Sequence, residues 1–277
     1  NRLIEADATK LDELRGILKA QENSDKLCGI GMKEIHIEHG AAKKICGAVK
    51  SLTNGKKVLM VDVDPQGNTT TGFGILKKEL GSTVYDVLIH RCPLENAIYK
   101  TKFDNLWIAP ANISLAGAEF ELVSAEGREA RLREALAGVR DQFDYIFVDC
   151  PPSLGILTMN ALCAADGVLV PLQCEYYSLE GLGQLMMTVK RIRTLYNPQL
   201  YLVGILITMY NGRLNHSQSV LDELKRYYKD KLFATPIARN VKLSEAPSFG
   251  MPVYYYDRHS KGAELYLKVA QELMERI

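Results

Sequence analysis

Short apolar segments alternate with longer stretches of helical period along most of this 277-residue chain. Several of these segments are apolar at consecutive positions, as strands are when both faces of a parallel sheet are covered. The expected strands are Glu34–Ile37, Lys57–Val63, Leu106–Ala109, Tyr145–Val148, Gly167–Leu172, Leu200–Thr208 and Leu232–Ile237. Amphipathic helices are expected between most of them, for example over Gly40–Leu52 and Leu179–Leu195. This alternation predicts an α/β fold with a doubly wound, mainly parallel sheet flanked by helices.

One α/β domain is expected over residues 33–277, because no repeat or Pro/Gly-rich linker interrupts that part. Residues 1–32 form an N-terminal extension in which Ala8–Asn23 has the pattern of a charged helix. A surface helix and a partner-binding helix are both compatible with this pattern. The first residues do not resemble a signal peptide, and no apolar run approaches the ~20 residues of a membrane span.

The charge balance excludes one broad class of function. The net charge is +1, which argues against a wholly basic nucleic-acid binder and leaves room for a local basic patch. The six cysteines form no CxxC pair, and several lie within apolar runs. Reduced core thiols and a cytoplasmic location are therefore expected.

Two expected strands end in carboxylates. Asp62 and Asp64 follow the apolar part of the segment Lys56–Asn68, and their alternation with one valine predicts side chains on the same side. A second apolar strand ends at Asp149. Ligands of open α/β sheets bind outside the carboxyl ends of the strands, and clustered carboxylates there need a cation or hydrogen-bond donors. Aspartates that cap turns are the structural alternative.

Several longer blocks resemble the ParA/Soj family of partition ATPases. VDVDPQGNTT is similar to the switch segment of that family, and DYIFVDCPPSLGILTMNAL to its Walker B strand and the following helix. PLQCEYYSLEGLGQL, GILITMYNGR, ARNVKLSEAPSFGMPV and YDRHSKGAELYLKVAQEL follow in the family's order. The resemblance covers roughly residues 55–277 and implies a P-loop NTPase-like fold.

The resemblance implies ATP and Mg²⁺ as cofactors, with catalysis at Asp64 and Asp62. Asp64 would orient or activate the attacking water, and Asp62 would support Mg²⁺ and the phosphates. Asp149 would be the Walker B acid that acts on Mg²⁺ indirectly. Gln66 and Gly67 would lie in the loop that senses the γ-phosphate.

Other implied contacts fall in the last part of the chain. Arg239 and Asn240 match the segment that the family places near adenine, although Ala238 replaces its usual proline. Arg213 and Lys242 match basic residues that contact DNA phosphates. The resemblance also implies an ATP-dependent homodimer, nonspecific DNA binding on the nucleoid and a centromere-binding partner of the ParB type.

The phosphate-binding loop of the family is not recognisable. A loop of the form KGGVGKTT should follow the first strand and hold the phosphates with backbone N–H groups and a lysine. The sequence there is KEIHIEHGAAKK, with one glycine and no GK[ST]. Three explanations stay open: a pseudo-ATPase that keeps the fold and loses turnover, a first ~55 residues that come from a gene rearrangement or altered reading frame, or an unfamiliar nucleotide-binding geometry. The alternative function is that of a catalytically silent DNA- or partner-binding protein.

Three rival functions are not favoured by the sequence. His36, Glu38 and His39 lack further ligands at metal-site spacing. Ser153 has no GxSxG context, which excludes a serine hydrolase of that type. A membrane-positioning ATPase of the MinD type would need a basic membrane anchor, whereas Gly262–Ile277 has the pattern of a packing helix.

Overall fold

The computed structural model describes residues 34–38 and 55–277. The helices expected over Ala8–Asn23 and Gly40–Leu52, and the sequence in place of the phosphate loop, lie outside the described residues. The strands are β1 (Glu34–Glu38), β2 (Val58–Asp62), β3 (Tyr99–Lys100), β4 (Leu106–Ala109), β5 (Tyr145–Cys150), β6 (Gly167–Gln173) and β7 (Tyr201–Thr208).

The helices follow the strands in the expected alternation. They are α3 (Asn68–Gly72), α4 (Val84–His90), α5 (Leu115–Glu121), α6 (Arg131–Ala137), α7 (Ile156–Ala164), α8 (Tyr176–Leu195), α9 (Asn215–Tyr228), α10 (Val241–Glu245), α11 (Val253–Tyr256) and α12 (Lys261–Arg276). Short 3-10 turns are η1 (Lys77–Glu79), η2 (Leu94–Ala97), η3 (Leu122–Ser124), η4 (Arg140–Gln142), η5 (Lys229–Lys231) and η6 (Ala246–Phe249).

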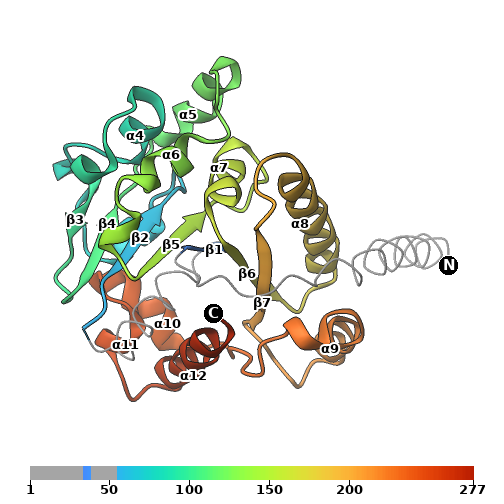
Figure 1. Cartoon of the computed structure of the whole chain (residues 1–277). Coiled ribbons are helices and arrows are strands. Elements are labelled where there is room, and N and C mark those ends of the chain that lie inside the picture. The colour runs from blue at the N-terminus through green and yellow to red at the C-terminus, as the bar shows by residue number, and fades with distance from the viewer. Residues whose placement is uncertain (1–33, 39–54) are drawn as a thin grey trace.

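The strands form one sheet in the order β3-β4-β2-β5-β1-β6-β7 (Figure 1). All neighbouring pairs are parallel except β3 with β4. Because β1 pairs with β5 on one side and β6 on the other, the strand order reverses around it. The predicted doubly wound, mainly parallel sheet is confirmed.

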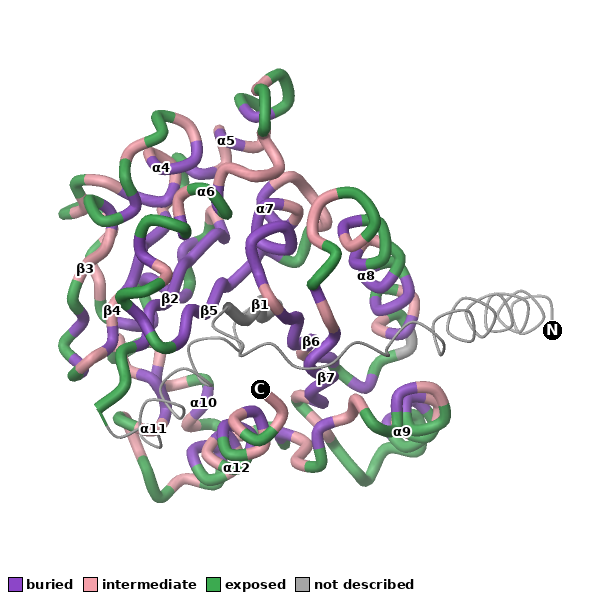
Figure 2. The backbone as a smooth tube through the Cα atoms, viewed as in Figure 1, coloured by how far each residue is buried: buried purple, intermediate pink, exposed green. Residues whose placement is uncertain are grey.

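Helices cover both faces of the sheet, and the buried strands run between them (Figure 2). Leu59 and Val61 of β2 pack into the layer of α4–α7. The alternate residues Val58 and Met60 pack into the layer of α10–α12. A third cluster joins α8 and α9 to β6 and β7. Such strands have no solvated face, which is why their sequences are apolar throughout.

The strand expected over Leu232–Ile237 is wrong. This segment runs beside β7, and the amides of Phe233 and Ile237 donate to the carbonyls of Ile205 (2.9 Å) and Ile207 (2.8 Å), but the pairing amounts to an isolated bridge at Leu232 and not to a strand. The Ala234 amide donates to the Glu272 carboxylate (3.0 Å) and not to a strand, and Pro236 has no amide hydrogen to donate. The two amides that donate to β7 are four residues apart, whereas consecutive donors in a ladder are two residues apart, so the ladder is interrupted between Phe233 and Ile237.

The cysteines in the described residues agree with the expected reduced thiols. Cys92, Cys150, Cys163 and Cys174 are free, and the last three are buried. Burial raises the pKa of the Cys163 thiol to about 11, which keeps it protonated near neutral pH.

Candidate functional site

Two carboxylates meet where β2 and β5 end. Asp62 and Asp149 are register partners in the parallel pair β2·β5. Asp62 is fully buried, and Asp149 is 2% exposed. The sequence predicted that the Asp62 and Asp64 side chains lie on the same side. In the structure, the carboxylate whose negative charge acts on Asp62 is that of Asp149. The parallel register therefore builds the acidic pair from two strands that are distant in the sequence.

Two hydroxyls of α3 hold this acidic pair. Thr70 donates its backbone amide (2.8 Å) and its hydroxyl (2.7 Å) to the same oxygen of Asp62. Thr69 donates its hydroxyl to Asp149 at 2.5 Å. The Thr70 hydroxyl also accepts from the Ala111 amide (3.0 Å), which fixes its orientation. Hydrogen bonds to a buried carboxylate offset part of the cost of taking it out of water.

The pKa of Asp62 is raised from its ordinary value of 3.8 to about 7. Burial is the main cause, and the negative charge of Asp149 adds to it. The hydrogen bonds from Thr70 and Asp64 lower the pKa, but they offset only part of this rise. A carboxylate whose charge is this costly is a favourable place for a cation, and strongly perturbed carboxyls at strand ends indicate functional sites.

Asp64 organises the loop that follows β2. Its side chain accepts from the Gln66 amide (2.9 Å), and its carbonyl accepts from the Gly67 amide (2.8 Å). Asp64 is 4% exposed and Gln66 is exposed. Gly67 has φ 58° and ψ 38°, and a Cβ there would lie 2.6 Å from the Ala111 carbonyl oxygen. Only glycine satisfies both the left-handed backbone and this close approach.

The first strand ends beside the acidic pair. Ile37 is the register partner of Asp149, and Glu38 of Cys150. The chain therefore leaves β1 at the same sheet edge where Asp62 and Asp149 lie. This is the place where the sequence predicts a phosphate loop and supplies no GK[ST].

Arg239 and Asn240 lie after the segment that borders β7. An isolated bridge joins Tyr210 to Ala238, and the Tyr210 amide donates to Ile237. Arg239 is exposed. The Asn240 side chain accepts from the Lys242 amide (2.9 Å) and so caps α10. Its observed role in the described structure is that of a helix cap.

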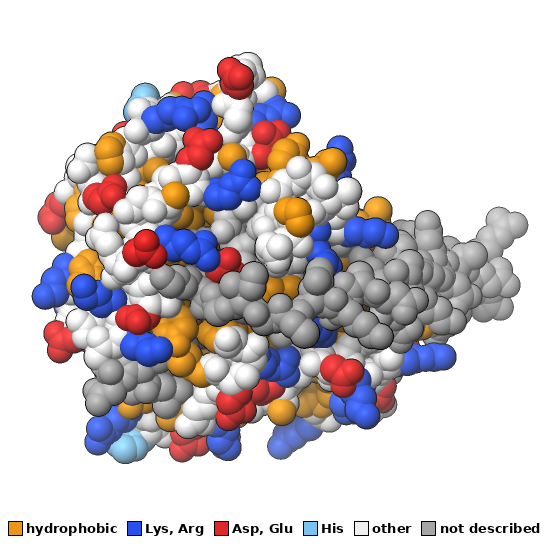
Figure 3. Space-filling view, in the orientation of Figure 1, with side chains coloured by type: hydrophobic (Ala, Val, Ile, Leu, Met, Phe, Trp, Pro, Cys, Tyr) orange, Lys and Arg blue, Asp and Glu red, His pale blue; other side chains and the backbone are white. Residues whose placement is uncertain are grey.

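Arg213 and Lys242, the expected DNA contacts, lie shortly after the bridge between Tyr210 and Ala238, Arg213 after Tyr210 and Lys242 after Ala238. Arg213 is exposed, and its amide donates to Asn211 in the turn before α9. The Lys242 ammonium forms an ion pair with Glu245 (2.8 Å). The hydrogen bond from Lys242 to Glu245, together with the Glu245 charge, raises the lysine pKa. On the face drawn in Figure 3, basic and acidic side chains are interspersed.

A close backbone contact links α3 to the α10 region. A Cβ at Gly250, which follows η6, would lie 2.6 Å from the Gly74 Cα. Both glycines have positive φ, 77° at Gly74 and 59° at Gly250. The segment after the Asp64 loop and the segment after α10 therefore touch through two glycines.

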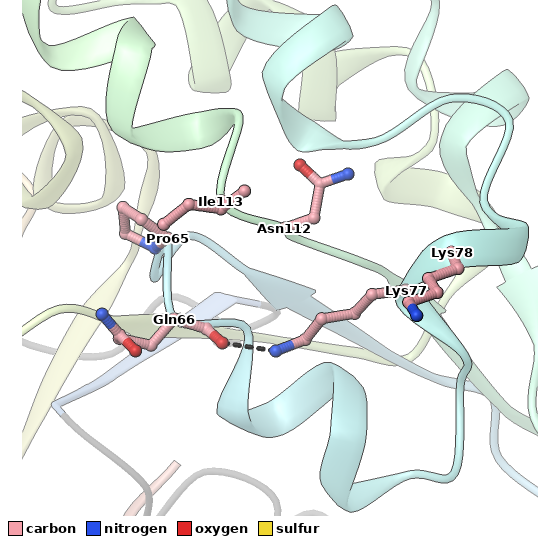
Figure 4. A pocket seen from close by; sticks show the side chains of 6 residues that line it. All are labelled: Pro65, Gln66, Lys77, Lys78, Asn112 and Ile113. Atoms are coloured by element: carbon pink, nitrogen blue, oxygen red, sulfur yellow. Dashed lines mark hydrogen bonds between the residues drawn. The ribbon is translucent and has the colours of Figure 1, made fainter.

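Sequence reasoning missed Thr69, Thr70 and Lys77. The threonines stand inside the quoted block VDVDPQGNTT, but nothing in the block indicates that their hydroxyls reach Asp62 and Asp149. Lys77 donates to the Gln66 carbonyl at 2.5 Å (Figure 4). No motif surrounds that lysine, so only the folded structure identifies it.

The described residues contain neither a cluster of metal-binding side chains nor a membrane-spanning helix. Among residues 34–38 and 55–277, no three His, Cys, Asp or Glu side chains converge as a metal-binding group. Within the same residues, no helix has both the length and the apolar character needed to cross a membrane. A cation at Asp62 and Asp149 would thus need further ligands from water or a bound molecule.

The chain is similar to known partition proteins over most of its length. A family described as "AAA domain" matches residues 42–202. The sporulation initiation inhibitor protein Soj of Bacillus subtilis is 51% identical over 219 residues, which are 79% of this chain and 87% of Soj. The chromosome partitioning protein ParA of Caulobacter vibrioides is 43% identical over 250 residues, 90% of this chain and 91% of that protein.

Solved structures agree on the fold. The cobyrinic acid a,c-diamide synthase of Mycobacterium smegmatis, with bound ATP analog and magnesium, has a TM-score of 0.76 and 36% identity. That match covers 88% of this chain and 94% of the other. Cyanothece McdA shares the fold at a TM-score of 0.77 and 20% identity, over 88% of this chain and 99% of McdA. Together with the acidic strand ends and the identities above, these matches establish that the chain belongs to the ParA/Soj family of chromosome partitioning proteins.

Proposed function

We propose that this protein is a partition ATPase switch whose acidic strand-end site binds Mg²⁺ together with the phosphates of ATP. The observation that carries the proposal is the buried pair Asp62 and Asp149, held by threonine hydroxyls at the carboxyl ends of adjacent strands. Nucleotide ligands of open α/β sheets bind at this edge.

The donors at this site fit Mg²⁺. The ion prefers oxygen ligands and is usually held by one or two carboxylates, water and substrate phosphates. Asp62 and Asp149 would hold it through water, and the ion would supply positive charge to the phosphate oxygens. Asp64 and the loop that it organises would orient the attacking water. Gln66 and Gly67 would respond to the γ-phosphate.

The affinity for ATP is expected to be weaker than that of a chain with the GK[ST] loop. Each charge-assisted hydrogen bond lost with such a loop costs about 1.5–3 kcal/mol of binding free energy. Arg239 remains the proposed contact near adenine. Asn240 is already engaged as the cap of α10, so its contribution to base binding would be made from its backbone or after the cap opens.

Equilibrium dialysis of ATP with and without Mg²⁺ tests this proposal. We expect Mg²⁺-dependent binding that is lost in Asp62→Asn. Asp144→Asn is the matched control, because Asp144 lies just before β5 at the opposite sheet edge and accepts from the Lys57 amide. Absence of Mg²⁺-dependent binding, or equal binding by both variants, would contradict the proposal.

One observation favours a second candidate, a catalytically silent DNA- or partner-binding protein. The sequence that follows β1 has no GK[ST], although the acidic pair is complete. In this case ATP would not bind, and DNA contacts by Arg213 and Lys242 would be few and independent of nucleotide. In the switch, ATP would bring two subunits together and double those contacts, with a ParB-type protein as the stimulating partner and the nucleoid as the location.

Duplex DNA binding against salt separates the two candidates. Each phosphate contact contributes a log–log slope of about −0.9. The switch predicts a steeper slope with Mg²⁺-ATP, which is lost in the Arg213→Ala/Lys242→Ala double variant. The silent protein predicts one shallow slope with or without nucleotide. Binding unaffected by the double variant would remove these residues from either account.

A further inference from the structure

The loop that carries Asp64 is held from within by Asp64 itself. The amides of Gln66 and Gly67 both donate to this residue, one to the side chain and one to the carbonyl. Any displacement of the loop would break these bonds and move Asp64. The carbonyl of Gln66 is directed away from this turn, and its partner comes from another segment.

That partner is Lys77, at the start of η1. Its ammonium donates to the Gln66 carbonyl oxygen at 2.5 Å. Its side chain also lies against Gly67: a Cβ added to Gly67 would be 2.7 Å from Lys77 Cε and 2.9 Å from Nζ. On the other side, the same Cβ would be 2.6 Å from the Ala111 carbonyl oxygen. The loop is thus enclosed between a lysine and a backbone carbonyl.

Lys77 forms no ion pair that would compete with this hydrogen bond within residues 55–277. Among the ion pairs of residues 55–277, none joins Lys77 to a carboxylate. The ammonium and the loop border a pocket of about 360 Å³, and Figure 4 shows the Lys77 side chain extended to the Gln66 carbonyl. The pocket is lined by Pro65, Gln66, Lys77, Lys78, Asn112 and Ile113. Lys78 lines the same pocket but is exposed, and its side chain makes no hydrogen bond with the described residues.

We propose that Lys77 is a positioning residue, which acts through the Gln66 carbonyl to hold the loop and, with it, Asp64. The contact with substrate belongs to Asp64, and Lys77 fixes where that carboxylate stands. A lysine is suited to this task because its flexible stem packs along Gly67 while its ammonium remains a strong donor. The catalytic part of this inference rests on the proposed function. The loop-holding part does not.

Hydrogen exchange of the full chain tests the loop-holding part. Lys77→Met keeps an unbranched side chain against Gly67 and removes the donor, and Lys78→Met removes the neighbouring charge only. In Lys77→Met the amides of Gln66 and Gly67 should exchange about tenfold faster, as for a lost hydrogen bond of about 1.4 kcal/mol. In Lys78→Met they should stay within about twofold of the parent, because no contact to the loop is lost. Lys77→Arg, which restores a donor, should recover the protection.

The amides of β5 should exchange equally in all variants, which shows that the fold is kept. If Lys77→Met loses its native circular dichroism spectrum, Lys77→Leu, which also lacks a donor, takes its place. Equal loop exchange in the Lys77 and Lys78 variants, or no recovery in Lys77→Arg, would overturn the positioning role.

Steady-state kinetics test the catalytic part. In Lys77→Met the kcat for Mg²⁺-ATP hydrolysis should fall about tenfold with KM within about twofold of the parent, because the lysine acts through the loop that positions Asp64. An equal fall in Lys78→Met would overturn the link to Asp64. If the parent chain does not bind ATP, the proposed function fails, while hydrogen exchange still decides whether Lys77 holds the loop.

Discussion

The pKa of Asp62 leads to a test of the acidic pair that needs no nucleotide. In the folded protein this carboxyl keeps its proton up to about pH 7, whereas in the unfolded chain it loses it near 3.8. Between these values the folded state binds the proton more tightly. The free energy of unfolding should therefore fall as the pH rises through this window. Asp62→Asn has nearly the same shape and cannot ionise, so it should lack this contribution.

The magnitude follows from the size of the shift. One pKa unit corresponds to about 1.4 kcal/mol, so a rise from 3.8 to about 7 corresponds to about 4 kcal/mol over the whole window. The part between pH 5 and pH 8 is about 2–3 kcal/mol. Asn cannot reproduce every hydrogen bond of Asp62, because one Asp62 oxygen accepts two bonds from Thr70 and the other accepts one from Asp64. The lost bond lowers stability by about 1 kcal/mol at every pH.

Urea unfolding at several pH values, followed by circular dichroism, measures the difference between the two proteins. At pH 4 and below the parent should be the more stable protein, because the hydrogen bond lost in Asp62→Asn then outweighs the small cost of ionising Asp62. From pH 5 to pH 8 the stability of the parent should fall by about 2–3 kcal/mol relative to Asp62→Asn, because only the parent then acquires the buried charge of Asp62. A difference that stays constant within about 0.5 kcal/mol from pH 5 to pH 8 would refute the reasoning, since it would mean that Asp62 titrates alike in both states.

Three further predictions concern the loop that carries Asp64, the contact between Gly74 and Gly250, and the ion pair between Lys242 and Glu245. Asp64→Ala should abolish any Mg²⁺-ATP hydrolysis while the circular dichroism spectrum stays native, and an unchanged rate would assign the residue to the turn alone. Gly250→Ala should lower the thermal midpoint more than Gly127→Ala, because both have positive φ but only a Cβ at Gly250 meets backbone, at 2.6 Å, whereas Gly127 has open space. Equal shifts would show that the backbone angle alone sets the cost. Glu245→Ala should release Lys242 and steepen the salt dependence of DNA binding by a log–log slope of about 0.9, and an unchanged slope would exclude that lysine as a phosphate contact.

The sequence determined the features that depend on local pattern. Strands such as Leu106–Ala109 were predicted to the residue, because a buried parallel strand is apolar at every position. The placement of Asp62 and Asp149 at strand ends was likewise readable, and so was the family, from several ordered blocks. The two-residue strand β3 was not predicted, since so short a segment has no periodicity.

The tertiary structure alone decided which side chains meet. Asp62 faces Asp149 because β2 and β5 pair in that register, and no spacing within either strand encodes their partner. Leu232–Ile237 has a strand-like sequence, yet the amides that donate to β7 are those of Phe233 and Ile237, four residues apart, so no continuous ladder forms. Lys77 reaches Gln66 because the turn after α3 brings η1 back to the loop. Each of these contacts joins segments whose proximity is set by packing of the whole core, and local sequence carries no record of that packing.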